Sequence, residues 1–542
     1  MALSMLKAVL LSINAKYVHS SLSVWYLAEG VLRYTRINHD VKVVEATINQ
    51  PCADIAAKVA EHTPDVVGVS VYIWNAGKFA DILNILRELL PGVIIILGGP
   101  EAAYNAEYWL NTGADYVLRG EGERAFPAFL DKEAPESIPG LCRMRDGKMH
   151  SNPQDEPPDD FVDPYSEAYF SALCGRISYI ETSRGCPFRC AFCLSGGDDN
   201  VRFLPVYVAE ERIYKLSQSH TQTVKLVDRT FNCNAERAYK LFSYVIGLDT
   251  KCCFHFEVVA DLFDGRTISL LSTAPPGRIQ LEAGLQSFYE PALAASFRRT
   301  DSAKAESNIR ALLRNQNIHI HVDLIAGLPF ETLLNFQDSF NRAYSLGAHT
   351  LQLGFLKMLH GSAMREQNES IIFADEPPYE IISSPWLSEA DLKIIRHTEN
   401  ALRNTYNKSR FLSAIRYTLS VSGLRPFALY RALGEAMPNH GISLVNYAEG
   451  VYNYLIKLPG VELNELRDCM TVDWLGMVKG ENMPDFLKTD SKRRKHVVLT
   501  AEKLLGRVIC RNEAAVLRSG KGVFADSQNR DPVTGLYKLY YL

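Results

Sequence analysis

Short apolar runs alternate along the first 135 residues with segments whose apolar residues recur at helical spacing. The runs at 7–13, 41–45, 66–72, 93–97 and 116–119 have strand length, and the segments at 19–34, 53–61, 78–90 and 102–111 carry the helical pattern. Continuous apolar strands that alternate with helices predict a doubly wound parallel sheet of the α/β class. Ligands of such a sheet bind at the carboxyl ends of its strands.

The same alternation returns after a stretch rich in Pro, Asp and Glu at 135–163. We interpret this stretch as an extended connector within a linker over 136–175. Strand-length runs follow at 177–180, 224–227, 254–259, 278–283, 319–325 and 351–356, each before a turn. Six such repeats predict a parallel partial (β/α)6 barrel of the TIM type over 176–365, open on one side, with its site at the carboxyl ends.

Helical spacing dominates the remaining segment, 366–542. Ser388 followed by Glu389 and Asp391 indicates a capped helix start with an acidic first turn, and this helix extends toward residue 404. Helical spacing recurs at 411–421, 426–437 and 443–458, and strands are possible at 522–526 and 535–541. We therefore expect a mainly helical C-terminal domain, behind an N-terminal domain at 1–135 and the central barrel.

Composition narrows the class of protein without giving a function. The 542 residues carry a net charge of −4, so nucleic acid and an anionic membrane are not expected as partners. The basic run at 492–496 is interpreted as a solvated face, and contact with nucleic acid or an acidic partner is the alternative. No apolar run approaches about 18 residues, so no membrane-spanning helix is expected. Eleven cysteines, an odd number without a secretion signal, predict a reducing, cytoplasmic compartment.

Three of the cysteines carry the most specific chemistry of the chain. Cys186, Cys190 and Cys193 have the spacing C-x3-C-x2-C and follow the first strand of the predicted barrel. Three thiolates can bind three irons of a [4Fe–4S] cluster and leave the fourth iron open for a ligand. The alternatives are a structural zinc site or three unrelated thiols. Zinc favours a fourth Cys or His at matching spacing, and none lies near in the sequence.

The stretch from Thr182 to Cys193 closely resembles the cluster loop of radical S-adenosylmethionine enzymes. The resemblance implies that the open iron chelates S-adenosylmethionine, and that an electron from the cluster cleaves it to methionine and a 5'-deoxyadenosyl radical. It also implies S-adenosylmethionine contacts from residues at the loop and at strand ends, namely Phe192, Asp228, Glu257, Glu282, Gln286 and Asp323. For any one of the strand-end residues, a structural ion pair or a helix cap is an equal alternative.

The N-terminal domain is Rossmann-like but lacks the G-x-G-x-x-G phosphate fingerprint after its first strand. It resembles the cobalamin-binding domain that precedes many radical S-adenosylmethionine enzymes, on the segment Ser70-Val71-Tyr72, the pair Gly98-Gly99 and the segment from Gly120 to Glu123. The resemblance implies cobalamin contacts from these strand ends, namely Tyr17, Ser70, Tyr72, Gly98, Gly99 and Glu121. A Rossmann-like module without a cofactor is the alternative.

His19 lies where such domains place a cobalt ligand, but the motif Asp-x-His-x-x-Gly is incomplete here. The loop after the first strand reads Asn-Ala-Lys-Tyr-Val-His-Ser-Ser, so the partner Asp and the Gly are missing. An imidazole ligand usually needs a second group to fix its tautomer. Cobalt ligation by His19 is thus one hypothesis, and a packing or capping role is the other.

Together the resemblances imply a cobalamin-dependent radical S-adenosylmethionine enzyme, methylase-like, that methylates an unactivated carbon through a 5'-deoxyadenosyl radical and methylcobalamin. An electron donor such as flavodoxin or ferredoxin is implied, and the C-terminal region resembles a domain of unknown function that follows this core in bacterial proteins. The alternatives are radical rearrangement or cyclisation without methyl transfer, and a non-catalytic cobalamin sensor. A methylthiotransferase would need a second three-cysteine cluster, and only Cys52 and Cys142 precede the linker. No motif names the substrate.

Overall fold

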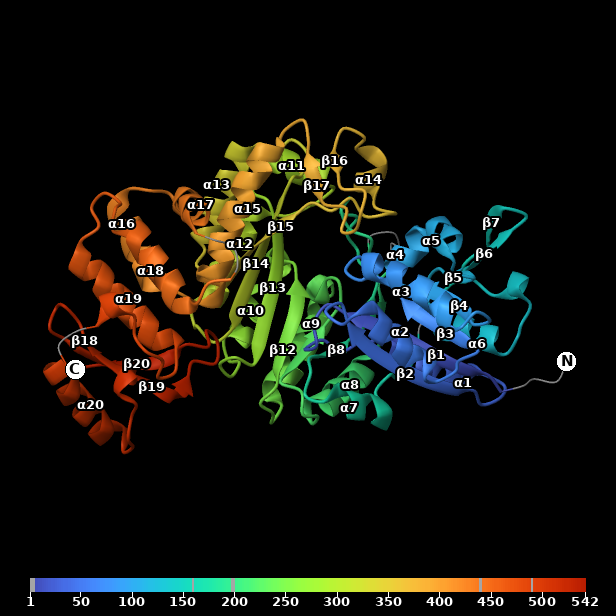
Figure 1. The fold of residues 1–542 in the computed structure, drawn as a ribbon, viewed down its shortest axis with the longest axis horizontal. Coiled ribbons are helices and arrows are strands. Elements are labelled where there is room, and N and C mark those ends of the chain that lie inside the picture. Colours follow the sequence, from blue (N-terminus) through green and yellow to red (C-terminus); the bar gives the residue numbers. More distant parts are fainter. Residues whose placement is uncertain (1–4, 158–159, 196–199, 438–440, 489–490) are drawn as a thin grey trace. The chain divides into compact units, whose positions relative to one another are not determined.

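The computed structural model describes residues 5–157, 160–195, 200–437, 441–488 and 491–542. The chain divides into two compact units, which are coloured along the sequence in Figure 1. Unit 1 comprises residues 1–257, 296–298 and 357–381, and unit 2 comprises residues 258–295, 299–356 and 382–542. None of the helices within the described ranges is long and apolar enough to cross a membrane.

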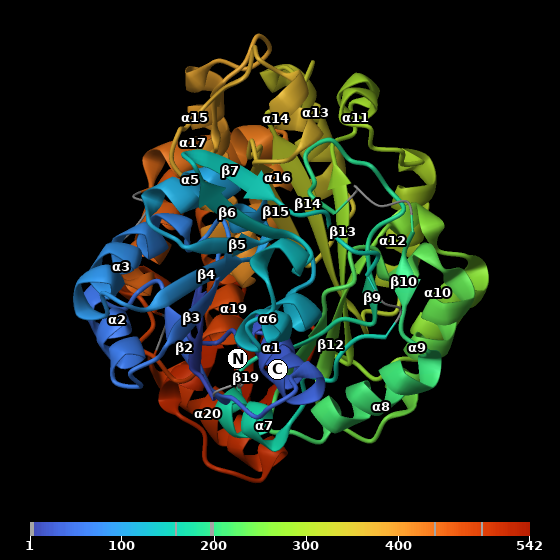
Figure 2. The same ribbon diagram turned by 90° about the vertical axis from the view of Figure 1, so that its right-hand side faces the viewer.

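Unit 1 begins with a seven-stranded sheet in the order β2-β1-β3-β4-β5-β6-β7. Figure 2 labels β2 and the strands from β3 to β7. The first five strands are parallel and correspond to the five predicted apolar runs. They are β1 (Lys7–Asn14), β2 (Asp40–Thr47), β3 (Val66–Ser70), β4 (Ile94–Gly98) and β5 (Tyr116–Leu118). Because β1 lies between β2 and β3, the strand order reverses there, and ligands of such sheets bind outside the carboxyl ends at this point.

Six helices connect or follow these strands. They are α1 (Ser23–Tyr34), α2 (Cys52–Ala60), α3 (Ala76–Leu89), α4 (Pro100–Tyr104), α5 (Ala106–Thr112) and α6 (Gly122–Leu130). The single helix expected over 102–111 is in fact two short helices that meet at Asn105, and α6 was not predicted. β3 is buried at all five positions, as expected of a central parallel strand with both faces covered.

The connector predicted over 135–163 contains a β-hairpin. Strands β6 (Leu141–Arg145) and β7 (Lys148–Ser151) pair antiparallel, and β6 also pairs with β5, so the hairpin extends the N-terminal sheet. Asp146 and Gly147 both have positive φ, 51° and 72°, which is the backbone that a tight two-residue hairpin turn requires. The interpretation of the whole stretch as an extended connector was therefore wrong for residues 141–151.

Unit 1 also contains the first three strands expected for the barrel, β8 (Ser178–Ile180), β11 (Thr223–Leu226) and β12 (Cys253–Val258), paired in parallel in that order. The helices of this part are α7 (Glu167–Leu173), α8 (Val206–Ser217), α9 (Ala235–Gly247) and α14 (Ala363–Gln367). Two short strands, β9 (Ser183–Arg184) and β10 (Arg202–Phe203), pair antiparallel and flank the three cysteines. β16 (Ile372–Phe373) pairs with β17 (Ile381–Ser383).

Unit 2 holds the other three expected strands, β13 (Ile279–Gln286), β14 (His319–Ala326) and β15 (Thr350–Phe355), again parallel. Buried and half-buried residues alternate along β13 and β14, so each strand buries one row of apolar side chains and presents a polar row on the other face. The helices here are α10 (Gly265–Leu271), α11 (Glu290–Ala295), α12 (Ser302–Leu313) and α13 (Leu333–Tyr344). All six predicted strands are thus present.

The C-terminal part of unit 2 is mainly helical, as predicted. Its helices are α15 (Glu389–Asn404), α16 (Leu412–Ser422), α17 (Pro426–Ala436), α18 (Leu444–Leu455), α19 (Leu463–Met477) and α20 (Ser491–Leu505). An antiparallel sheet follows, with strands β18 (Ala514–Val516), β19 (Gly522–Arg530) and β20 (Tyr537–Tyr541). The predicted start of α15 is confirmed, because Asp391 N–H donates to Ser388 Oγ (3.2 Å) and Ser388 N–H donates to Asp391 Oδ2 (3.0 Å).

Glu331 lies in the turn between β14 and α13 and is fully buried. Ser287 Oγ donates to its Oε1 (2.5 Å), and Ser339 Oγ donates to the same atom (3.3 Å). Burial raises the pKa of Glu331 from 4.5 to about 7. The folded chain therefore keeps a proton on Glu331 in a pH range where the unfolded chain has lost it.

We expect this carboxyl to reduce stability as the pH rises from about 4.5 to about 7, because the folded state binds more protons than the unfolded state in that window. Glu331→Gln has the shape of the protonated acid and no charge. At pH 8 it should raise the free energy of unfolding by on the order of 3 kcal/mol relative to wild type, and at pH 5 by much less. Urea unfolding at both pH values measures this, and equal effects at pH 5 and pH 8 would contradict it.

Candidate active site

The three cysteines lie on an irregular loop that the backbone fixes at several points. Gly185, just before Cys186, has φ +92°, and a Cβ there would lie 2.8 Å from the carbonyl oxygen of Asn200. Ala191 N–H donates to the carbonyl of Ser296 (2.9 Å), and Met364 N–H donates to the carbonyl of Ala191 (2.8 Å). The loop is therefore held by segments distant in sequence within unit 1.

The thiols of Cys186, Cys190 and Cys193 are free; the first two cysteines are buried and the third is exposed. Burial raises the pKa of Cys190, and the positive charge of Arg298, whose Nη1 lies 3.8 Å from Cys190 Sγ, opposes this rise. The charges of Cys193 and Cys186 also act on Cys190, which indicates that the thiols lie near one another. Three soft sulfur donors beside a cation fit an iron–sulfur cluster with one open position.

Asp228 is buried directly behind the start of this loop. Its carboxylate accepts bonds from Thr182 N–H (3.1 Å), from Thr182 Oγ1 (3.0 Å) and from Ser183 Oγ. Burial raises the pKa of Asp228 to about 6, and these hydrogen bonds oppose the rise. The carboxylate thus fixes the backbone just before the cysteines, and its predicted contact with S-adenosylmethionine stays a prediction.

A buried arginine joins the cysteine loop to the N-terminal domain. Arg184 forms ion pairs with Glu121 (2.8 Å), Glu123 (2.6 Å) and Glu181 (2.9 Å). Burial would lower its pKa, but the charges of Glu181 and Glu123 raise it well above the usual range. Glu121 also pairs with Arg202 on β10. Glu121, which was predicted to contact cobalamin, therefore links the two parts of unit 1, and a cobalamin contact stays a prediction.

A second link joins β2 and the loop after β1 to β8 and the residues just before it. Arg176 binds Glu45 in a bidentate pair, at 2.9 and 3.1 Å. His19 Nδ1 lies 2.5 Å from the hydroxyl of Tyr179. Burial lowers the pKa of His19, and the charges of Lys225 and Lys16 lower it further. Tyr179 supplies the second group that the sequence motif lacked, and cobalt ligation by His19 stays a hypothesis.

The other residues predicted for cobalamin lie at the carboxyl edge of the N-terminal sheet. Ser70, at the end of β3, shares a hydrogen bond with Ser23 (2.8 Å between the hydroxyl oxygens). The ring of Tyr72 stacks on Trp74 at 4.3 Å between centroids.

The surface of this edge fits a large organic cofactor. A Cβ on Gly98 would meet nothing nearer than a carbonyl oxygen at 4.0 Å, whereas one on Gly99, at φ +87°, would lie 2.5 Å from the carbonyl oxygen of Val71. Tyr17 is 72% exposed and Trp74 47% exposed. Exposed aromatic rings in the loops after β1 and β3, and open space at Gly98, suit a broad, partly apolar ligand.

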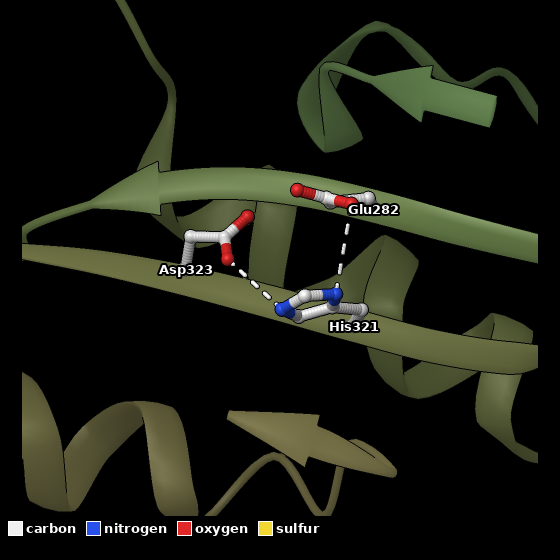
Figure 3. A group of neighbouring side chains, drawn as sticks. All are labelled: Glu282, His321 and Asp323. Carbon is white, nitrogen blue, oxygen red and sulfur yellow. Dashed lines mark ion pairs between the residues drawn. The ribbon is translucent and has the colours of Figure 1, made fainter. Parts of the chain in front are cut away.

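In unit 2, Glu282 and Asp323 meet around a histidine that sequence reasoning missed. The imidazole of His321 lies between them, with Nε2 3.0 Å from Asp323 Oδ1 and Nδ1 3.6 Å from Glu282 Oε2, as Figure 3 shows. His321 and Asp323 share one face of β14, and Glu282 is opposite His321 in the register with β13. The three donor atoms lie within 4.8 Å of one another, so this group could also hold a metal ion.

Three further residues were predicted to contact S-adenosylmethionine: Gln286, Glu257 and Phe192. Gln286 ends β13 with φ +69°, at an irregularity in the pairing with β14, and its amide folds back over Gly284. Glu257 lies half-buried on β12, and Phe192 lies half-buried on the loop between Cys190 and Cys193. Their predicted contacts with S-adenosylmethionine stay predictions.

Protein families of known description match most of the chain. The family described as B12 binding domain matches residues 8–130, and the radical SAM superfamily matches residues 180–343. A family described as a protein of unknown function, DUF4080, matches residues 368–515.

Individual proteins are similar over longer stretches. TokK, a cobalamin-dependent radical SAM methyltransferase from Streptomyces tokunonensis, is 22% identical over 491 residues, which cover 81% of this chain and 69% of TokK. An uncharacterized methyltransferase from Pyrococcus horikoshii is 28% identical over 235 residues, or 40% of this chain, and the chain spans half the length of that relative (50%).

A solved structure shares the fold. The radical S-adenosylmethionine methyltransferase TsrM from Kitasatospora setae, with cobalamin and a [4Fe–4S] cluster bound, matches with a TM-score of 0.56 and 17% identity. The match covers 69% of this chain and 79% of TsrM. The chain therefore combines a B12 binding domain, a radical SAM domain and a DUF4080 domain, and it is homologous to the cobalamin-dependent radical S-adenosylmethionine methyltransferases.

Proposed function

We propose that this protein is a cobalamin-dependent radical S-adenosylmethionine methyltransferase that methylates an unactivated carbon of its substrate. The observation that carries the proposal is the connection within unit 1 between the cysteine loop and the N-terminal domain. The loop presents three free thiols, and Arg184 beside them is paired with Glu121 and Glu123, which follow β5 of the N-terminal sheet. One compact unit thus brings the elements expected for a cluster and for cobalamin together.

We assign the cluster to Cys186, Cys190 and Cys193, and cobalamin to the carboxyl edge of the N-terminal sheet. Bound there, the cluster with S-adenosylmethionine supplies a radical and cobalamin supplies a methyl group. Arg298 favours the thiolate form of Cys190, which iron binding requires. Asp228 holds Thr182 and Ser183 and so orients the loop before the first cysteine.

In unit 2, the polar face of β13 and β14 offers groups that can bind or protonate a ligand. The carboxylates of Glu282 and Asp323 lie on either side of the His321 imidazole, at 3.6 and 3.0 Å from its two nitrogens. We propose that Phe192, Glu257, Glu282, Gln286 and Asp323 contact S-adenosylmethionine, and that His321 orients the carboxylates of Glu282 and Asp323.

The arrangement of the strands and the domain boundaries are also part of this proposal. We propose that the six strands β8 and β11–β15 form the partial barrel, with the N-terminal cobalamin domain before it and the DUF4080 domain after it. Because the β6–β7 hairpin belongs to the N-terminal sheet, that domain extends to about residue 151 instead of 135. An electron donor such as flavodoxin or ferredoxin is required to reduce the cluster.

The test of the activity follows a labelled methyl group. Cells that produce the protein are grown with methionine whose methyl group carries deuterium, and their metabolites are compared with those of cells that produce Cys186→Ala. The proposal expects a deuterium-labelled metabolite that is present only with the wild-type chain. If purified wild-type protein forms 5'-deoxyadenosine while no metabolite gains label, methyl transfer is excluded and rearrangement or cyclisation takes its place.

A further inference from the structure

Unit 2 contains a cavity that lies outside the residues discussed so far. Its volume is about 440 Å³, within the range of small-molecule sites. It is lined by the turn after α15, the end of α19 and the turn between β19 and β20, together with Leu444. The cavity is therefore built by the C-terminal part of the chain, for which the reaction proposed above needs no residue.

Positive side chains outnumber negative ones among the residues that line this cavity. Lys408, Arg410, Lys479 and Arg530 line it, against the single carboxylate of Glu481, although the whole chain has a net charge of −4. Throughout the described part of the chain, none of the four cations forms a salt bridge. Burial lowers the pKa of Arg410, and burial together with the charges of Arg410 and Arg403 lowers the pKa of Lys408.

Arg410 is the half-buried member of this set whose side chain has no hydrogen bond to a described residue, whereas Lys479 is exposed. Lys408 Nζ donates to Asn404 Oδ1 (3.0 Å), and Arg530 Nη2 donates to the hydroxyl of Tyr537 (2.7 Å). The half-buried guanidinium of Arg410 has no hydrogen bond to any described residue. A guanidinium offers five N–H donors in a planar fork that matches carboxylate and phosphate oxygens.

The backbone fixes Arg410 at the wall of the cavity. The residues on either side of it, Ser409 and Phe411, both have positive φ, 52° and 55°. Ser409 Oγ donates to the carbonyl of Thr534 (3.4 Å), Arg410 N–H donates to the carbonyl of Thr405 (2.8 Å), and the ring of Phe411 is fully buried. Strained backbone of this kind persists where the surrounding structure holds it, and it is common at ligand sites.

We propose that this cavity binds a small organic molecule through a phosphate group. The phosphate oxygens would accept bonds from Arg410 and lie among Lys408, Lys479 and Arg530, whose four positive charges favour a multiply charged anion over a single carboxylate. The organic part would lie against the apolar lining residues Leu444, Met477 and Val478. The site is independent of the proposed methyl transfer.

The test measures binding of inorganic pyrophosphate to the full chain by titration calorimetry at constant ionic strength, with succinate as a parallel probe. We expect about one pyrophosphate site per chain, and a loss of affinity of at least about tenfold in Arg410→Gln. Lys479→Gln, at an exposed position on another wall, should also weaken pyrophosphate binding. Because an exposed lysine contributes little to folding, this variant separates a loss of binding from a folding defect in Arg410→Gln. Lys457→Gln, an exposed lysine outside the cavity, is the matched control and should bind as wild type.

Two results would overturn the assignment. Equal pyrophosphate affinity in wild type, Arg410→Gln and Lys479→Gln would place the anion elsewhere. Binding of succinate without binding of pyrophosphate would exclude a phosphate group as the recognised element. The iron content of Arg410→Gln should equal that of wild type, so the outcome does not depend on the proposed reaction.

Discussion

Replacing Cys186, Cys190 or Cys193 by alanine, one at a time, is expected to abolish the cleavage of S-adenosylmethionine. A cluster held by three thiolates with one open iron has no spare protein ligand, so the loss of one thiolate leaves two open irons and an unstable cluster. Iron bound after anaerobic reconstitution should fall from about four atoms per chain to well below one. 5'-Deoxyadenosine, measured by chromatography, should fall below detection.

Cys52→Ala is the matched control for this series. Cys52 begins α2 in the N-terminal domain, is half-buried and is a free thiol like the three loop cysteines. The variant should bind iron and cleave S-adenosylmethionine as wild type does. Undiminished 5'-deoxyadenosine in any of the three loop variants would refute the cluster assignment. Tightly bound zinc in place of iron in the wild type would favour the structural zinc site instead.

The second large effect concerns Arg184, whose replacement by alanine should destabilise unit 1 by about 3–5 kcal/mol. Its side chain is only 13% exposed and pairs with three carboxylates. Glu121 keeps Arg202 as a partner after the substitution, whereas Glu123 and Glu181 lose the guanidinium. Removal of one member of a buried ion-pair network costs more than the network contributes, because charges remain buried without compensation. Urea unfolding of the anaerobic apoprotein, followed by tryptophan fluorescence, measures the loss.

Arg33→Ala removes an arginine–carboxylate pair of similar length, Arg33 to Asp160 at 2.6 Å, in which both side chains are about half exposed. This control should cost less than about 1 kcal/mol, because water screens exposed pairs. Arg184→Ala should also lower cobalamin and iron content together, since the residue joins both parts of unit 1. An unfolding free energy within 1 kcal/mol of the Arg33→Ala value would show that the network does not hold unit 1 together.

The local sequence pattern was enough to predict the parallel strands, but not the short antiparallel ones. The five N-terminal strands and the six later ones could be predicted because each carries apolar residues over strand length, continuous in β3 and alternating in β13 and β14. The hairpin at 141–151 was missed because its strands are polar and short, although Asp146-Gly147 is a hairpin signal that could have revealed it. α19 was missed because buried Thr471 and Asp473 interrupt its apolar pattern, and Asp473 there accepts bonds from the backbone of α16.

In the candidate site, too, local sequence features could be predicted and contacts between distant residues could not. The cysteine spacing is local and could be read directly from the sequence. Glu123, a partner of Arg184, lies 61 residues away, and the position of His321 opposite Glu282 depends on the pairing of β13 with β14. Such contacts depend on strand order and register, which the local pattern of a single sequence does not reveal. The hydroxyl of Tyr179 beside His19 is a third case, since the two residues are 160 positions apart.

The most direct test of the central claim is a count of iron and cobalt in the wild-type chain. The protein is reconstituted without oxygen with iron, sulfide and hydroxocobalamin, desalted, and both metals are determined together with the absorption spectrum. We expect about four iron atoms and about one cobalt atom per chain, with the absorption bands of a [4Fe–4S] cluster and of bound cobalamin. Iron without cobalt would contradict it, because the N-terminal domain would then be a Rossmann-like module without a cofactor and methyl transfer through cobalamin would be excluded.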